Sequence, residues 1–105
     1  MVLLTGKDEK MLYPYIELPD ETIITHSKIK PDNTVLINFE QPVENGFREA
    51  KIKLPSYKWL YLPSYKWLYN EWFSNEQIAS FEDFAHKNSA VIYKYARLGG
   101  IDNNN

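Results

Sequence analysis

A chain of 105 residues suits one domain, and its 44% hydrophobic content is enough to form a buried core. The net charge of −2 gives no general attraction to nucleic acid or anionic membranes, and the lack of cysteine excludes disulfides and thiolate chemistry. The lack of cysteine also favours a cytoplasmic protein, and no apolar run approaches the length of a membrane span.

The N-terminal part of the chain predicts strands joined by a turn. Residues 11–18 favour an edge strand or an irregular segment, because Pro14 cannot donate a hydrogen bond to a neighbouring strand. Residues 22–30 and 34–41 are rich in β-branched and other apolar side chains, which favours strands. The sequence Lys-Pro-Asp-Asn at 30–33 is typical of a tight turn, so we expect a β-hairpin here.

The middle of the chain predicts a further strand with a basic outer face. The Asn-Gly pair at 45–46 is a turn signal. In the segment that follows, residues 47–54, apolar and charged side chains alternate with the period of two that a half-buried strand requires.

The last third of the sequence changes to helical periodicity. Ser74 and Gln77 fit a capping box, in which two side chains satisfy free backbone N–H groups at a helix start. Apolar residues then recur at helical spacing. The Asn-Ser pair at 88–89 is expected to break this helix, and the glycine pair at 99–100 is expected to end it.

These elements predict a single α+β domain over residues 1–105, with 1–10 and 101–105 as mobile ends. The expected architecture is an antiparallel β-meander of three or four strands, followed by one broken or two short C-terminal helices packed on the sheet. The expected core residues are Ile23, Val35, Ile37, Phe39, Ile52, Ile78, Phe81, Val91, Ile92 and Tyr95.

Residues 54–61 and 62–69 have the identical sequence LPSYKWLY. We interpret this exact repeat as a tandem duplication, since structural repeats are longer and imperfect. Each copy is expected to be an extended entry followed by a turn or a single helical turn, because Leu-Pro disfavours helix. The two copies would compete for the one place in the fold that a single copy occupied before the duplication. The displaced copy is therefore expected to form an extra loop or to mediate dimerisation.

Aromatic and basic residues are interleaved between residues 47 and 72, which supports two hypotheses for binding. Trp and Tyr are preferred anchors of protein interfaces. The candidate interaction residues are Tyr57, Lys58, Trp59, Tyr61, Tyr65, Lys66, Trp67, Tyr69 and Trp72. The alternative partner is single-stranded nucleic acid, whose bases would stack on the aromatic rings while its phosphates contact the cations. Its candidate cations are Arg48, Lys51, Lys53, Lys58 and Lys66.

An enzyme is the third hypothesis. Glu82 and His86 lie four residues apart on the expected helix, which suits an acid–base pair, although a surface ion pair is the simpler interpretation. His26 is expected to be an outward-facing strand residue. The sequence contains no phosphate loop, nucleophile motif or HExxH motif, so we predict no catalytic residue, no metal site and no cofactor.

The sequence therefore predicts a small non-enzymatic interaction or regulatory module, of the kind found among bacterial and phage proteins. Its partner is expected to be another protein, including a second copy of itself. Nucleic acid is the less favoured partner, and no membrane partner is expected.

Overall fold

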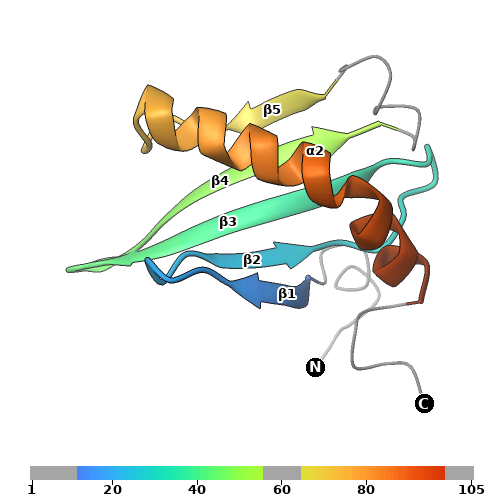
Figure 1. Ribbon diagram of the computed structural model, residues 1–105, viewed down its shortest axis with the longest axis horizontal. Helices are drawn as coiled ribbons and strands as arrows, with labels where there is room; N and C mark the ends of the chain where they lie inside the picture. Colours follow the sequence, from blue (N-terminus) through green and yellow to red (C-terminus); the bar gives the residue numbers. More distant parts are fainter. Residues whose placement is uncertain (1–11, 56–64, 99–105) are drawn as a thin grey trace.

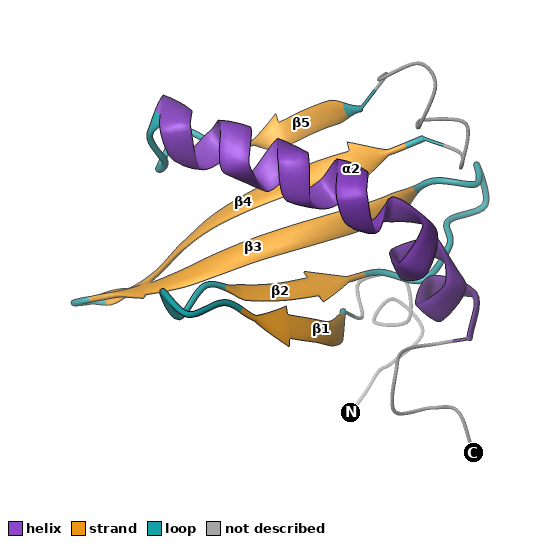
Figure 2. Ribbon diagram, in the orientation of Figure 1, coloured by secondary structure: helices purple, strands orange, loops and turns teal. Residues whose placement is uncertain are grey.

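The computed structural model describes residues 12–55 and 65–98, which form two layers (Figure 1). The described elements are β1 (Tyr13–Glu17), β2 (Ile23–His26), β3 (Val35–Val43), β4 (Gly46–Leu54), β5 (Lys66–Tyr69) and α2 (Asn75–Leu98). Each strand pairs antiparallel with the next one in sequence, so the sheet order is β1-β2-β3-β4-β5. Helix α2 runs obliquely across one face of this sheet (Figure 2). The predicted α+β class and the antiparallel meander are thus confirmed.

The described sheet has five strands where the sequence predicts three or four, and β5 is the strand that was not expected. It consists of residues 66–69 of the second repeat copy, for which we predicted a turn or a single helical turn. Leu54, the first residue of the first copy, ends β4. Both copies therefore contribute to the sheet. Residues 56–64 lie outside the described residues, as do the predicted mobile ends and the glycine pair at 99–100.

Helix α2 starts at the predicted capping box. The Gln77 N–H donates to Ser74 Oγ at 3.1 Å, and the Ser74 N–H donates to Gln77 Oε1 at 3.0 Å. This exchange satisfies two backbone N–H groups at the start of α2, and it fixes where the helix begins after β5.

The predicted break at residues 88–89 is wrong, because α2 continues unbroken from 75 to 98. Asn88 stays in the helix by donating from Nδ2 to the Phe84 carbonyl oxygen, while its Oδ1 accepts a hydrogen bond from the Tyr15 hydroxyl. Ser89 donates from Oγ to the His86 carbonyl oxygen. Hydrogen bonds of this kind let Asn and Ser side chains stay in a helix interior.

The core lies between α2 and the strands. Six of the predicted core residues are buried there, namely Val35, Ile37, Phe39, Ile52, Phe81 and Ile92. Ile78 is half-buried and packs against this core, and Tyr95 is also half-buried. Val91 is 43% exposed, so its prediction as a core residue is wrong. In a single continuous helix, the inward positions after Ser89 are Ile92, Tyr93 and Ala96.

Strand β2 has the opposite facing from the one we predicted. Ile24 and His26 are fully buried and stand opposite Phe39 and Ile37 of β3, so they face α2. Ile23 faces the other way and is only half-buried. A change of one residue in the facing of a strand moves every side chain to the other side of the sheet. The predictions of Ile23 as core and of His26 as outward-facing are therefore both wrong, because both assume the same incorrect facing of β2.

The buried imidazole of His26 has one hydrogen-bond partner. Its Nδ1 donates to the Ser27 carbonyl oxygen at 2.9 Å, and its Nε2 has no partner among the described residues. The rings of Tyr13 and Tyr15 lie beside it, with centroids at 5.8 and 6.3 Å. Burial lowers the pKa of His26 from its ordinary value of 6.5, since a charged imidazole would lose its hydration there.

We expect the free energy of unfolding to decrease as the pH falls below 6.5, because unfolded His26 binds a proton more readily than folded His26. This loss levels off below the lowered pKa of the folded state. The His26→Gln variant should lose this part of the pH dependence in urea denaturation measured at several pH values. The control is Ser80→Ala, which changes an exposed, uncharged residue of α2 and should follow the wild-type curve. Parallel curves for wild type and His26→Gln would contradict the prediction.

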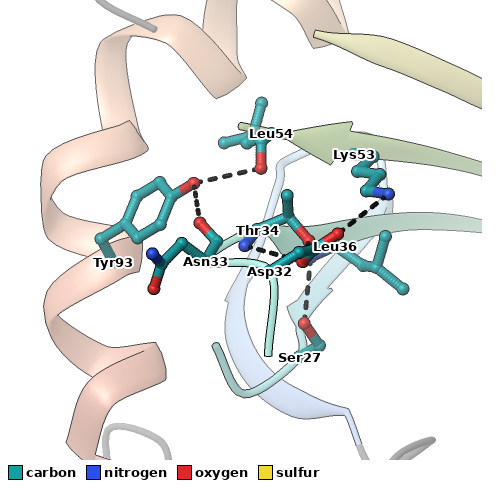
Figure 3. A network of polar contacts seen from close by, with 8 residues as sticks. All are labelled: Ser27, Asp32, Asn33, Thr34, Leu36, Lys53, Leu54 and Tyr93. Carbon is teal, nitrogen blue, oxygen red and sulfur yellow. Dashed lines mark hydrogen bonds and ion pairs between the residues drawn. The ribbon is translucent and has the colours of Figure 1, made fainter. Parts of the chain in front are cut away.

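Tyr93 ties α2 to the end of β4 (Figure 3). Its hydroxyl lies 3.1 Å from the Leu54 carbonyl oxygen and 3.4 Å from the Asn33 carbonyl oxygen, and it donates to this pair. Burial, followed by the charge of Asp32, raises the pKa of Tyr93 to about 12. The hydroxyl thus holds the helix against both the strand end and the β2–β3 turn.

The Tyr93→Phe variant should lower the free energy of unfolding by about 1–2 kcal/mol, because it removes a buried donor from two carbonyl oxygens. Tyr95→Phe is the matched control, since Tyr95 is half-buried on the same helix. Urea denaturation of both variants checks this. Equal losses in the two variants would show that the Tyr93 hydroxyl does not stabilise the fold.

Candidate interaction face

The second face of the sheet points away from α2, and we call it the open face because no described helix or strand covers it (Figure 1). Side chains alternate between the two faces along each strand. Since Phe39 stacks on Phe81 of α2, the neighbouring positions Asn38 and Glu40 belong to the open face. Glu40 is half-buried there, whereas Asn38 is fully buried, so the open face is not exposed at this position. The register of each strand pair then assigns the remaining residues.

Three rows of side chains on this face each cross three or more strands. The first, which we call the acidic row, contains Glu17, Ile23, Glu40 and Glu49. The middle row contains Pro14, Thr25, Asn38, Lys51 and Tyr69. The third, the basic row, contains Leu36, Lys53 and Lys66. The open face therefore changes from acidic to basic along the strand direction.

The acidic row places like charges next to each other. Glu40 and Glu49 stand directly opposite on β3 and β4, an arrangement that destabilises a sheet. No described lysine, arginine or histidine lies within ion-pair distance of either carboxylate. Glu49 accepts a hydrogen bond from Tyr69, and burial together with this carboxylate raises the pKa of Tyr69 to about 12.

The basic row repeats this arrangement with the opposite sign. Lys53 and Lys66 stand opposite each other on β4 and β5. The Lys53 Nζ lies 3.4 Å from Asp32 Oδ2 (Figure 3). Lys66 has no described carboxylate within ion-pair distance. A hydrogen bond from Thr34, followed by the contact with Lys53, lowers the pKa of Asp32 and keeps it charged.

A groove of about 490 Å³ lies at the basic end of the open face. Leu68 lines this groove and is 45% exposed. It is the extra residue of β5 where the β4–β5 register shifts between Lys51 and Ile52. The groove is lined by Lys30, Pro31, Asp32, Thr34, Leu36, Lys53 and Leu68. Apolar side chains thus lie in this groove beside charged ones.

The predicted interaction residues fall into three groups. Lys66 and Tyr69 lie on the open face, as described above. Trp67 belongs to the core side, where its ring lies 6.1 Å from Phe39 and its Nε1 donates to Glu82 at 2.7 Å, and Tyr65 packs beside it. Trp72 is 69% exposed in the middle of the β5–α2 connection. The remaining candidates, Tyr57, Lys58, Trp59 and Tyr61, lie outside the described residues.

Three of the predicted nucleic-acid cations, Lys51, Lys53 and Lys66, share the open face. Arg48 faces the other side, where it donates to Gln41 and to the Trp72 carbonyl oxygen. Its guanidinium also lies 4.8 Å from the Phe73 ring, so it serves to hold the β5–α2 connection. Lys58 lies outside the described residues.

The acidic row was not anticipated from the sequence. Its three glutamates come from β1, β3 and β4 and are far apart in the chain, so only the strand register brings them together. Their one signal in the sequence is the alternation of Glu49 with apolar residues along β4.

Glu82, the acidic member of the Glu82–His86 pair, accepts a hydrogen bond from Trp67. Within residues 12–55 and 65–98, no group of three His, Asp or Glu side chains is placed to hold a metal ion. No helix in these ranges combines the length and the apolar character that crossing a membrane requires. Comparison of this chain with protein-family models, curated proteins and solved structures finds no match.

Proposed function

We propose that this protein is a non-enzymatic module that binds another protein through its open face. The observation that carries this proposal is the combination of the apolar groove with the charged rows beside it. Leu36 and Leu68 supply apolar surface, Lys53 and its ion-pair partner Asp32 line the same groove, and Lys66 stands opposite Lys53 on β5. Protein interfaces combine a desolvated apolar centre with a polar and charged rim in this way. The lack of cysteine supports a cytoplasmic setting.

The chemistry of the groove defines the kind of partner. An apolar side chain of the partner would enter between Leu36 and Leu68 and remove both from water. Carboxylates next to that side chain would meet Lys53 and Lys66. We therefore expect a partner whose contact surface has acidic residues around an apolar one.

A protein partner is favoured over single-stranded nucleic acid by the acidic row. Glu40 and Glu49 lie on the same face as the three lysines and would repel a phosphate backbone. Tyr69 adds little as a stacking platform, because it is half-buried and its hydroxyl is held by Glu49.

Affinity capture from a lysate with three versions of the protein as bait tests this proposal. The wild type and a control carrying Lys87→Glu and Lys94→Glu on exposed positions of α2 should retain the same protein in stoichiometric amount. A variant carrying Lys53→Glu, Lys66→Glu and Leu68→Asp should lose it. Retention of the partner by that variant would exclude the open face. Capture of nucleic acid that elutes with salt would instead support the alternative.

A further inference from the structure

The β3–β4 hairpin presents exposed apolar side chains at one end of the sheet. Its turn lies at residues 44–45, and the hairpin projects past the other strands and α2 (Figure 1). Phe47 is 62% exposed and stands opposite Pro42, and Val43 is 44% exposed. Aromatic side chains are enriched in protein interfaces relative to the rest of the surface, so an exposed ring on a projecting hairpin is suited to act as an anchor.

The surroundings of Phe47 are acidic. Glu44 is exposed in the turn of the hairpin, and Glu49 lies two residues after Phe47 on the same face of β4. Arg48 faces the α2 side of the sheet, where its guanidinium lies 4.8 Å from the Phe73 ring. Phe47 is therefore an apolar side chain with carboxylates beside it and with no cation on its own face between residues 40 and 49.

The groove at the other end of the open face has the complementary character. Lys30, Lys53 and Asp32 line it together with apolar side chains, and Lys66 stands opposite Lys53 on β5. Because these lysines outnumber the aspartate, this end of the sheet attracts carboxylates. The groove volume of about 490 Å³ is also sufficient to receive an aromatic ring.

Resting on the proposed function of the groove, we propose that its partner is a second copy of this chain, whose β3–β4 hairpin enters the groove. The Phe47 ring of one copy then lies between Leu36 and Leu68 of the next copy. The carboxylates beside the ring approach the lysines beside the groove. Removal of the ring and the two leucines from water stabilises this contact, and the opposite charges fix its orientation.

The two contacting surfaces are different, so the copies associate head to tail. Phe47 and Lys53 are six residues apart along β4, which is about 20 Å for a strand. Asn38, on the same face between the two ends, is fully buried, so the hairpin and the groove are separate surfaces. Each copy uses its hairpin toward one neighbour and its groove toward another. Such heterologous contacts generate rings or open chains, rather than a two-fold dimer.

Sedimentation velocity with two variants tests this proposal. The hairpin variant carries Glu44→Lys and Phe47→Thr and keeps its groove. The groove variant carries Lys66→Glu and Leu68→Asp and keeps its hairpin. All four positions are exposed, so both variants should fold, as circular dichroism would show. The wild type should grow past the dimer as its concentration rises to about 1 mM, because one hairpin in one groove is a small contact.

Each variant alone lacks one half of the contact and should associate at least about thirtyfold more weakly than the wild type, as expected when an interface anchor is lost. In an equimolar mixture, the hairpin of the groove variant can still enter the groove of the hairpin variant. The mixture should therefore form a dimer with one chain of each kind and stop there, since neither chain can bind a further copy.

Two further preparations separate this contact from general effects of charge and folding. The control carrying Lys87→Glu and Lys94→Glu on α2 should assemble like the wild type. A milder pair of variants, Phe47→Ala and Leu68→Ser, removes the apolar contact without a change of charge. These two variants should show the same pattern, each weakened alone and restored to a dimer when mixed.

A wild type that stays monomeric at this concentration would overturn the proposal, as would a mixture that fails to associate or that grows past the dimer. Variants that assemble as strongly as the wild type would place the contact elsewhere on the molecule and would also overturn it. If the wild type is monomeric but the bait carrying Lys53→Glu, Lys66→Glu and Leu68→Asp loses a captured partner, self-association fails and the proposed function stands. If capture is also unaffected, both fail.

Discussion

Replacing Phe39 with alanine is expected to lower the free energy of unfolding by about 3–5 kcal/mol, the largest effect of any single substitution considered. Phe39 is fully buried at the centre of β3, and its ring stacks on Phe81 of α2 with centroids 4.3 Å apart. It also contacts Phe84 and Trp67, at 6.3 and 6.1 Å. Its removal would leave a cavity where β3, β5 and α2 meet.

Urea denaturation of Phe39→Ala, with Phe39→Leu as the conservative variant, measures this effect. The leucine variant should lose about 1 kcal/mol, because it fills most of the volume. Phe47→Ala serves as the control, since Phe47 is 62% exposed and its loss should change the free energy of unfolding by less than about 0.5 kcal/mol. A loss in Phe39→Ala no greater than that in Phe47→Ala would contradict the packing described for the core.

The second large effect is expected at Trp67, and it also distinguishes the two repeat copies. Trp67→Ala should lower the free energy of unfolding by about 3 kcal/mol, because it removes the ring packed on Phe39 and the indole donor to Glu82. Trp59 occupies the same position in the first copy, with identical neighbours in sequence. The two tryptophans therefore differ only in where the fold places them.

Thermal and urea denaturation of Trp67→Ala and Trp59→Ala, side by side, test this assignment. If the second copy forms β5, as the structure has it, Trp67→Ala gives the larger loss of stability. Trp67→Phe should recover part of the loss, since it restores the ring but not the donor. A large loss in Trp59→Ala with little change in Trp67→Ala would show that the first copy occupies β5 instead.

The architecture explains why the sheet has an open face. A five-stranded antiparallel sheet has two faces, and α2 is the one helix among the described residues. Antiparallel sheets commonly leave one face in contact with water, and their alternating strands place charged residues there. In β4 the alternation puts Ile52 into the core and Lys51 and Lys53 on the open face. The open face is thus the face of the sheet that α2, the one helix among the described residues, does not cover.

Several features of this protein followed from the sequence alone, because they depend on neighbours in the chain. The period of two in residues 47–54 predicts β4, and the Ser74–Gln77 capping box predicts the start of α2. The turn at residues 30–33 predicts the β2–β3 hairpin, in which the Asn33 N–H donates to the Lys30 carbonyl oxygen. Local hydrogen bonding and side-chain spacing are sufficient for each of these.

Other features were decided by tertiary structure. In β2, Ile23 and Ile24 are equally apolar, so the pattern does not say which one faces the core, and pairing with Phe39 selects Ile24. At residues 88–89, the Asn-Ser pair remains helical because Tyr15, distant in sequence, holds Asn88. Identical sequence also does not determine which copy of the repeat forms β5.

The open face shows the same division. The sequence displays Lys51 and Lys53 as the outer residues of a strand, and this prediction needed only the alternation within β4. It does not show that Glu40 lies opposite Glu49, or that Lys66 lies opposite Lys53, because these neighbours come from different strands. Strand register depends on hydrogen bonds between segments far apart in the chain, and only the folded sheet brings these charges into rows.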